Sequence, residues 1–186
     1  MDATLPEGFR YVGEFISIQE EQELLRRMEA LAFDEVKMHN RVAKRKTLHF
    51  GWRYGYESWT ITPGNPVPDW IVPLRERVSA LMEEPAERIE EVLLSQYPPG
   101  AGIGWHRDAP MFGPKVVGVS LGGVCRFRFQ RGRGDMRETS EHRLEPRSAY
   151  LITGQARTLW QHSIPPTKAL RYSITFRTVR RPLVSP

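Results

Sequence analysis

The chain has 186 residues, 40% of them hydrophobic and 26% charged, with a formal net charge of +5 and a pI near 9.6. This length suits a single domain over residues 1–186, and the composition is that of an ordinary soluble globular protein. No apolar run approaches the ~18 residues of a membrane span and the polar start MDATLPEGFRY argues against a signal peptide, so we expect a cytoplasmic protein, or a nuclear one in a eukaryote.

Two amphipathic helices are predicted in the first half of the chain. The first covers 18–32, because Ser17 and Glu20 have the spacing of a capping box and apolar residues recur at helical intervals after them. The second covers 69–83, with Asp69 as its expected N-cap. Its apolar stripe consists of Trp70, Ile71, Leu74, Val78 and Leu81. Between the helices, RVAKRKTLHFGWRYGYESWT (41–60) is rich in basic and aromatic residues and predicts strands and loops that reverse near Gly55.

From residue 90 onward, short segments rich in β-branched and aromatic residues alternate with turn residues. The segments are EEVLLSQY, KVVGVSLGG, CRFRFQ, SAYLIT, TLWQHS and LRYSITFRTV. Such spacing predicts an antiparallel sandwich or barrel, with the two helices packed on one sheet. The fold class is therefore α+β and mainly β. We expect 131–143 to be an exposed hairpin loop, the final VSP to be loose, and Cys125, the only cysteine, to be a core residue.

The segment GIGWHRDAP (102–110) holds a candidate metal site. If 105–109 is extended, His106 and Asp108 project from one face of the strand. They are then either two solvated polar residues or two ligands of one ion, which would need a third ligand. Of the later histidines, His142 lies among charges and looks solvated, so we select His162 in LWQHSIPP. Two histidines and one carboxylate are the ligand set of non-haem Fe(II) oxygenases.

A predicted strand near the C-terminus has two arginines on one face. In RYSITFR (171–177), Arg171 and Arg177 share a face with Ser173 and Thr175, and apolar residues form the other. The arginine face either meets solvent or lines a barrel, where buried guanidiniums require anions. Arginine binds carboxylates bidentately, so a dicarboxylate fits the second alternative. Beside an Fe(II) site with open positions, the pair indicates a 2-oxoglutarate site.

These motifs, taken in order, resemble those of the AlkB-type Fe(II)/2-oxoglutarate dioxygenases. The resemblance includes the lead SQYPPGAGIGWHRD into the His-x-Asp pair and the aromatic segment FGWRYGY, and covers about residues 48–177. It implies a double-stranded β-helix (jelly roll) with its core at about 90–180 and a nucleotide-recognition segment at about 38–62. It also implies Fe(II), 2-oxoglutarate and O₂ as requirements for activity.

The resemblance assigns roles to several residues. His106, Asp108 and His162 would hold iron. Arg171 and Tyr97 would bind the distal (C5) carboxylate of 2-oxoglutarate, and Arg177 would lie near the C1 carboxylate and the metal ligands. This chain has Ser95 and Ser173 where the family commonly has asparagines, so these two cosubstrate positions depart from the family pattern.

The implied substrate is an alkylated nucleobase. Trp52 and Tyr56 match the positions that contact the damaged nucleotide, and an aromatic surface helps to hold a base outside its stack. The basic residues Arg41, Lys44, Arg45 and Lys46 are expected to meet phosphates, in keeping with the basic pI. Pro110 replaces an acidic residue that some members use for base selection.

The resemblance therefore implies oxidative dealkylation of N-alkylated bases in DNA, as in direct-reversal repair. From the size of the chain we expect a monomer. RNA is an alternative substrate, and a protein side chain is a second one. A binding module with an inactive site is a third reading, which the intact ligand triad and arginine pair disfavour.

Overall fold

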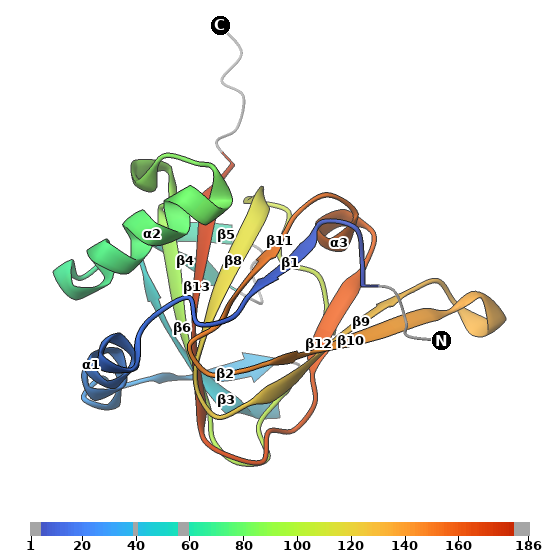
Figure 1. Ribbon diagram of the computed structural model, residues 1–186, viewed down its shortest axis with the longest axis horizontal. Coiled ribbons are helices and arrows are strands. Elements are labelled where there is room, and N and C mark those ends of the chain that lie inside the picture. Colours follow the sequence, from blue (N-terminus) through green and yellow to red (C-terminus); the bar gives the residue numbers. More distant parts are fainter. Residues whose placement is uncertain (1–4, 39–40, 56–59, 181–186) are drawn as a thin grey trace, which may run out of the picture.

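The computed structural model describes residues 5–38, 41–55 and 60–180, and Figure 1 shows their arrangement. Two antiparallel sheets face each other, and the larger has the strand order β1-β11-β8-β13-β6-β3-β2. Its strands are β1 Phe9–Val12, β2 Asp34–Met38, β3 Arg41–Phe50, β6 Glu91–Tyr97, β8 Phe112–Gly122, β11 Ala149–Ile152 and β13 Arg171–Val179. The smaller sheet has the order β10-β9-β12-β7, built from β7 Ile103–His106, β9 Cys125–Arg131, β10 Glu138–Leu144 and β12 Gln161–Ile164. These two facing sheets form the predicted jelly roll.

Three helices and one separate hairpin complete the described fold. The helices are α1 Ile18–Glu29, α2 Val72–Met82 and α3 Gly154–Thr158, and short 3₁₀ turns cover η1 Asp69–Ile71, η2 Ala86–Arg88 and η3 Gly134–Met136. The hairpin pairs β4 Trp52–Gly55 with β5 Thr60–Pro63, as the expected reversal near Gly55 requires. None of the described helices combines the length and apolar character needed to cross a bilayer.

Helix α1 begins where its capping signal predicts. The Ser17 hydroxyl accepts from the backbone N–H of Glu20, and the Glu20 carboxylate accepts from the backbone N–H of Ser17. The helix ends at Glu29 rather than at 32, because the N–H of Leu31 bonds to the carbonyl of Met28 and tightens the last turn. Glu20 also forms an ion pair with Arg77 of α2, at 2.6 Å, which joins the two helices.

The second helix differs from its prediction at the start. Residues 69–71 form a 3₁₀ turn, and the α-helix begins at Val72 with Pro73 in its first turn, where a missing N–H costs nothing. The N-cap is Pro68 for the 3₁₀ turn and Ile71 for the α-helix, so the expected cap at Asp69 is wrong. The helix ends at Met82 and is followed by the C-cap Glu83, whose φ of 53° is left-handed.

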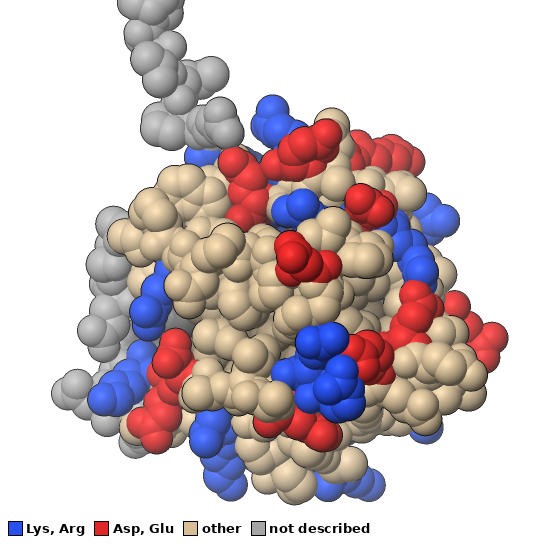
Figure 2. Space-filling model, turned by 90° about the vertical axis from the view of Figure 1, so that its left-hand side faces the viewer, with Lys and Arg blue, Asp and Glu red and all other residues tan. Residues whose placement is uncertain are grey.

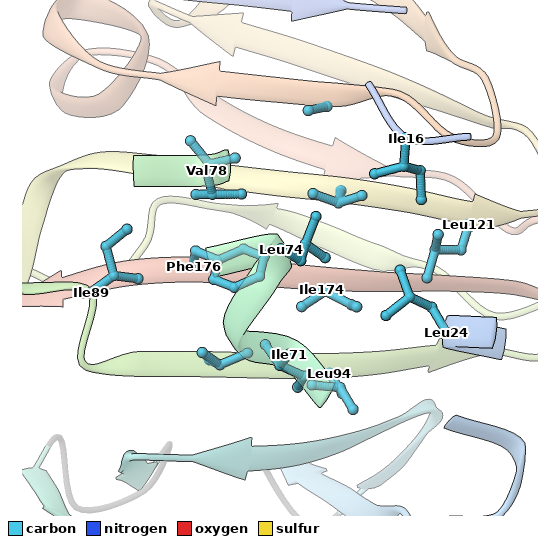
Figure 3. Close-up of a cluster of buried hydrophobic side chains, with 14 of the residues drawn as sticks. Ile16, Leu24, Ile71, Leu74, Val78, Ile89, Leu94, Leu121, Ile174 and Phe176 are labelled. Atoms are coloured by element: carbon cyan, nitrogen blue, oxygen red, sulfur yellow. The ribbon is translucent and has the colours of Figure 1, made fainter. Parts of the chain in front are cut away.

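Both helices cover the outer face of the larger sheet, as predicted. Their buried side chains pack against alternate residues of the central strands, which Figure 3 shows for Leu24, Leu74 and Val78 with Ile174 and Phe176. On the solvent side of this layer, acidic and basic side chains are interspersed (Figure 2). The described residues of that face therefore form no single-sign patch for a polyanion.

The two sheets enclose a second cluster between them. It is mainly aromatic and includes Phe127 and Phe129 of β9, Tyr150 of β11 and Trp160, with Cys125 buried beside them as expected. Gly118 of β8 allows the Tyr150 ring to cross the sheet, because a Cβ at 118 would lie 2.3 Å from Cζ of that ring. The open end of this interior is the cavity described below.

Three local predictions are corrected by the structure. Residues 131–143 are mostly strand, since β9 reaches Arg131 and pairs with β10 from Glu138, which leaves a short connection between them. The segment TLWQHS begins in helix α3 and becomes strand only at Gln161. Strand β7 ends at His106, so Asp108 stands just beyond it. The expected loose tail lies outside the described residues.

Candidate active site

Strand β13 places its polar face in the interior, not in solvent. Arg171, Ser173, Thr175 and Arg177 all line a cavity between the sheets, and each is less than 9% exposed. The opposite face, with Tyr172, Ile174 and Phe176, packs in the helix-covered core. The cavity occupies about 430 Å³, part of it open to solvent.

The strand register arranges the inner face of the larger sheet in rows. One row joins Arg171 with Tyr97 of β6. The next consists of hydroxyl side chains, Thr47, Ser95, Ser173 and Ser120, on four neighbouring strands. A further row places Arg177 opposite Glu91. A polar surface thus crosses the sheet beneath the cavity.

The three predicted ligands come together on the other side of this cavity. His106 and His162 are opposite each other in paired strands, and their ring centroids are 4.3 Å apart. Nε2 of His162 lies 3.7 Å from Oδ2 of Asp108. Two atoms that each lie about 2.1 Å from one ion are at most about 4.2 Å apart, so this separation suits a shared ion.

Hydrogen bonding leaves one nitrogen of His106 directed to this site. Nδ1 lies 2.8 Å from the carbonyl oxygen of Gly104, which can only accept, so Nδ1 carries the proton and Nε2 keeps its lone pair. Metal-ligating histidines typically have such a partner on the other nitrogen.

Electrostatics keep the set in the protonation states that metal binding needs. Burial, followed by the charge of His106, lowers the pKa of His162 to about 3. Burial also lowers the pKa of His106. Burial alone would raise the pKa of Asp108, but Arg177 and the two histidines outweigh it and hold that pKa well below its usual value. Both imidazoles are therefore neutral and the carboxyl ionised at pH 7.

The residues fit a divalent iron by chemistry and by proximity. Within the described ranges, however, no three His, Cys, Asp or Glu side chains already have the close arrangement of a filled metal site. Oδ1 of Asp108 instead accepts from Nη2 of Arg177. The side chains would close around an ion by small rotations, and the ligand assignment stays a prediction.

Arg171 is the clearest candidate for binding an external anion. It is 1% exposed, its Nε donates to Ser120 at 3.1 Å, and its guanidinium carbon lies 4.9 Å from the centre of the Tyr97 ring. Its Nη1 is buried and has no hydrogen-bond partner among the described residues. A buried donor of a charged group left without an acceptor is costly, so this nitrogen fits a carboxylate that enters the cavity.

Arg177 is bound differently from the sequence-based expectation. Its Nη1 donates to Glu91 at 3.1 Å and its Nη2 to Asp108. Its charge is therefore balanced by two protein carboxylates, so one dicarboxylate need not satisfy both arginines. The position of Arg177 beside a predicted metal ligand is as expected.

The predicted substrate residues divide into three groups. Arg45 is 4% exposed and lines the cavity, where it donates to Ser95 at 3.3 Å, so a role at an exposed phosphate is wrong for it. Residues 45, 47 and 49 face inward along β3, whereas Lys44 and Lys46 alternate outward and are exposed. Trp52 on β4 is half-buried. Tyr56 and the side chain of Arg41 lie outside the described residues.

Two charged residues of the site were not predicted. Glu91 is fully buried, and its period-two relation to Tyr97 could have placed it on the cavity face. Arg157 of α3 donates to the carbonyls of Asp108 and Ala109, at 3.0 and 2.9 Å, and so fixes the segment beyond β7. No sequence pattern connects residue 157 with residue 108.

The structure corrects the reason for which His142 was set aside as a ligand. It is half-buried rather than solvated, with its ring 4.4 Å from that of Tyr11. It lies on β10, opposite Phe127 of β9 in the strand register, and does not itself line the cavity.

Comparison with known proteins identifies the family. A model of the 2OG-Fe(II) oxygenase superfamily matches residues 8–177. The chain belongs to this superfamily. Membership implies a requirement for Fe(II), 2-oxoglutarate and O₂, as the sequence motifs also did. In this chain His106, Asp108 and His162 are available for the metal, and the buried Arg171 is available for the cosubstrate.

The relatives place this oxygenase chain among the AlkB-like members. It is 31% identical over 172 residues to the tRNA (carboxymethyluridine(34)-5-O)-methyltransferase ALKBH8 of Mus musculus, covering 88% of this chain but 25% of that one. It is 29% identical over 133 residues to the probable RNA/DNA demethylase ALKBH6 of Danio rerio, covering 68% and 51%. The chain thus spans about a quarter to a half of these relatives.

A solved structure supports the fold. OsALKBH1 superposes with a TM-score of 0.73 at 16% identity, covering 94% of this chain and 98% of that one. At this identity the likeness concerns the fold alone, and it agrees with the jelly roll of the facing sheets.

Proposed function

We propose that this oxygenase oxidises N-alkylated bases in nucleic acid and thereby releases the alkyl group. For an N-methyl base the products would be the unmodified base and formaldehyde, with succinate and CO₂ from 2-oxoglutarate. The observation that carries the proposal is one cavity lined by His106, Asp108 and His162 and by the buried Arg171, whose Nη1 has no acceptor among the described residues.

The side chains of the cavity divide the work. His106, Asp108 and His162 would hold Fe(II), and Arg157 would keep Asp108 in reach through the two carbonyls that it binds. Arg171 would bind the distal carboxylate of 2-oxoglutarate, with Tyr97 beside it. When bound, iron and 2-oxoglutarate supply the oxidation of a C–H bond by O₂; the protein supplies position, charge balance and exclusion of water.

The substrate would enter from the side of β3 and the β4–β5 hairpin. Trp52 on that hairpin supports an aromatic contact with a base held outside its stack. Arg45, inside the cavity, would face an acceptor on the substrate or cosubstrate rather than the nucleic-acid backbone. The net charge of +5 favours a polyanionic partner.

DNA and RNA are two forms of this proposal. DNA follows from the resemblance to repair enzymes, and the relative named as an alkylated DNA repair protein ALKBH8 homolog in Arabidopsis thaliana supports it. RNA is favoured by the mouse relative, which is named for a tRNA modification.

The test is mass spectrometry of methylated DNA and RNA oligonucleotides incubated with protein, Fe(II), ascorbate and 2-oxoglutarate. We expect mass losses of one methylene on the base and succinate in equal amount. His106→Ala should abolish both, whereas Trp52→Ala should mainly reduce oxidation of the base and leave 2-oxoglutarate turnover without substrate nearly unchanged. Succinate formation with no change in any oligonucleotide would reject a nucleic-acid substrate, and binding that does not weaken with salt would point the same way.

A further inference from the structure

Glu91 is a fully buried carboxylate that the proposed reaction does not use. It begins strand β6 and lies directly opposite Arg177 in the register with β13. A buried carboxylate is costly unless it is paired and hydrogen-bonded. Among the described residues Glu91 has two side-chain partners: Nη1 of Arg177 at 3.1 Å from Oε2, and Nδ1 of His49 at 3.3 Å from Oε1.

The Arg177 guanidinium connects Glu91 to the predicted metal site. One terminal nitrogen donates to Glu91 and the other to Oδ1 of Asp108, while Oδ2 of Asp108 faces His162. A single positive charge is therefore shared by two carboxylates. Because these three side chains are buried, each pairing affects the other.

We propose that Glu91 is a positioning residue that controls, through Arg177, how strongly Asp108 binds a divalent metal. It rests on the metal site of the proposed function. With the Glu91 side chain in place, Arg177 is held at one end and only half neutralised by Asp108, so the Asp108 carboxylate can still give electron density to an ion. Without the charge at 91, Arg177 would pair with Asp108 alone and would compete with the metal for it. The site would also be one unit more positive, which repels a dication.

Both effects act in the same direction, so Glu91→Gln should weaken metal binding. Removal of a unit charge within about 10 Å of a dication, at an intermediate effective dielectric constant, corresponds to an affinity loss of about ten- to a hundredfold. Glu91→Asp keeps the charge but withdraws it from Arg177 by one methylene, and should cause a smaller loss, about three- to tenfold. Glu87→Gln is the control, because it removes an exposed carboxylate near the same strand.

The experiment is titration of the metal-free full chain with Co(II), followed by visible absorption, with no 2-oxoglutarate present. The dissociation constant and the number of sites are fitted separately, since a merely structural defect lowers the fraction of molecules that bind but not the affinity of those that do. Circular dichroism of each metal-free variant checks the fold. An affinity in Glu91→Gln within threefold of the unsubstituted chain would overturn the proposal. If that variant does not fold, an unchanged affinity in Glu91→Asp would overturn it instead.

A double-variant cycle tests the route through Arg177. In an Arg177→Gln background, Glu91→Gln should lower Co(II) affinity by a clearly smaller factor than in the unsubstituted chain, because the connecting guanidinium is absent and only the direct effect of the lost charge remains. An equal loss in both backgrounds would show that Glu91 does not act through Arg177. If Co(II) binding to the unsubstituted chain does not depend on His106 or His162, the proposed metal site itself fails, which is a different result from failure of the Glu91 role alone.

Discussion

The two faces of strand β13 show how one alternating segment builds both the core and the site. Ile174 and Phe176 face α1 and α2 (Figure 3), and Tyr172 belongs to the same core cluster. Burial of apolar surface stabilises this contact without any directional partner. Arg171 and Arg177 face the cavity and are as deeply buried, but burial there is unfavourable unless each charge finds an anion.

The cavity face therefore requires groups of opposite charge opposite its arginines, whereas the core face requires only apolar side chains of fitting shape. Arg177 donates hydrogen bonds to the carboxylates of Glu91 and Asp108, whereas Nη1 of Arg171 is a buried donor with no acceptor among the described residues. This difference indicates that Arg177 supports the predicted metal ligands, whereas Arg171 can bind an external ligand.

The largest expected effect is on the core face. Phe176→Ala should lower the free energy of unfolding by about 3–5 kcal/mol, because it removes a fully buried ring and leaves a cavity under the helices. Urea unfolding followed by circular dichroism measures it. Ser173→Ala, on the other face of the same strand, should cost no more than about 1.5 kcal/mol. Similar losses for the two variants would break the comparison between the faces.

A smaller effect is expected for the free donor on the cavity face. Arg171→Gln should raise the KM for 2-oxoglutarate by about 10- to 100-fold, as expected when a hydrogen bond to a charged group worth about 1.5–3 kcal/mol is lost. Succinate formation at varied 2-oxoglutarate concentration is the measurement. Arg128→Gln, whose guanidinium instead lies 5.0 Å from the exposed Trp105 ring, is the matched control. An unchanged KM in the Arg171 variant would remove the cosubstrate assignment.

The smallest effect concerns the layer that covers the core face. Ser17→Ala removes the side-chain cap of α1 and should cost about 1 kcal/mol of stability with no change in KM. Ser79→Ala, which loses only a local hydroxyl contact in α2, should cost less. A change in the KM for 2-oxoglutarate in the Ser17 variant would mean that the helix layer on the core face of β13 affects cosubstrate binding on its cavity face, contrary to the comparison.

Much of the site was predictable because it depends on local periodicity and motif order. Alternation in RYSITFR placed four residues on one face, and the capping pattern at Ser17 placed the start of α1. The same alternation along β6 would have reached Glu91 from Tyr97, but an acidic residue at a strand end is equally typical of a solvated terminus. Arg157 and the inward turn of Arg45 had no local signal at all.

By itself the sequence determined the period of each element, the order of its motifs and the family, since these follow from neighbouring residues. Only the tertiary structure decided which polar face was buried, which arginine was already neutralised, and that residues 91, 108 and 177 share one charge network. The physical reason is that the energy of a buried charge depends on the groups that face it, and those groups come from strands distant in the chain.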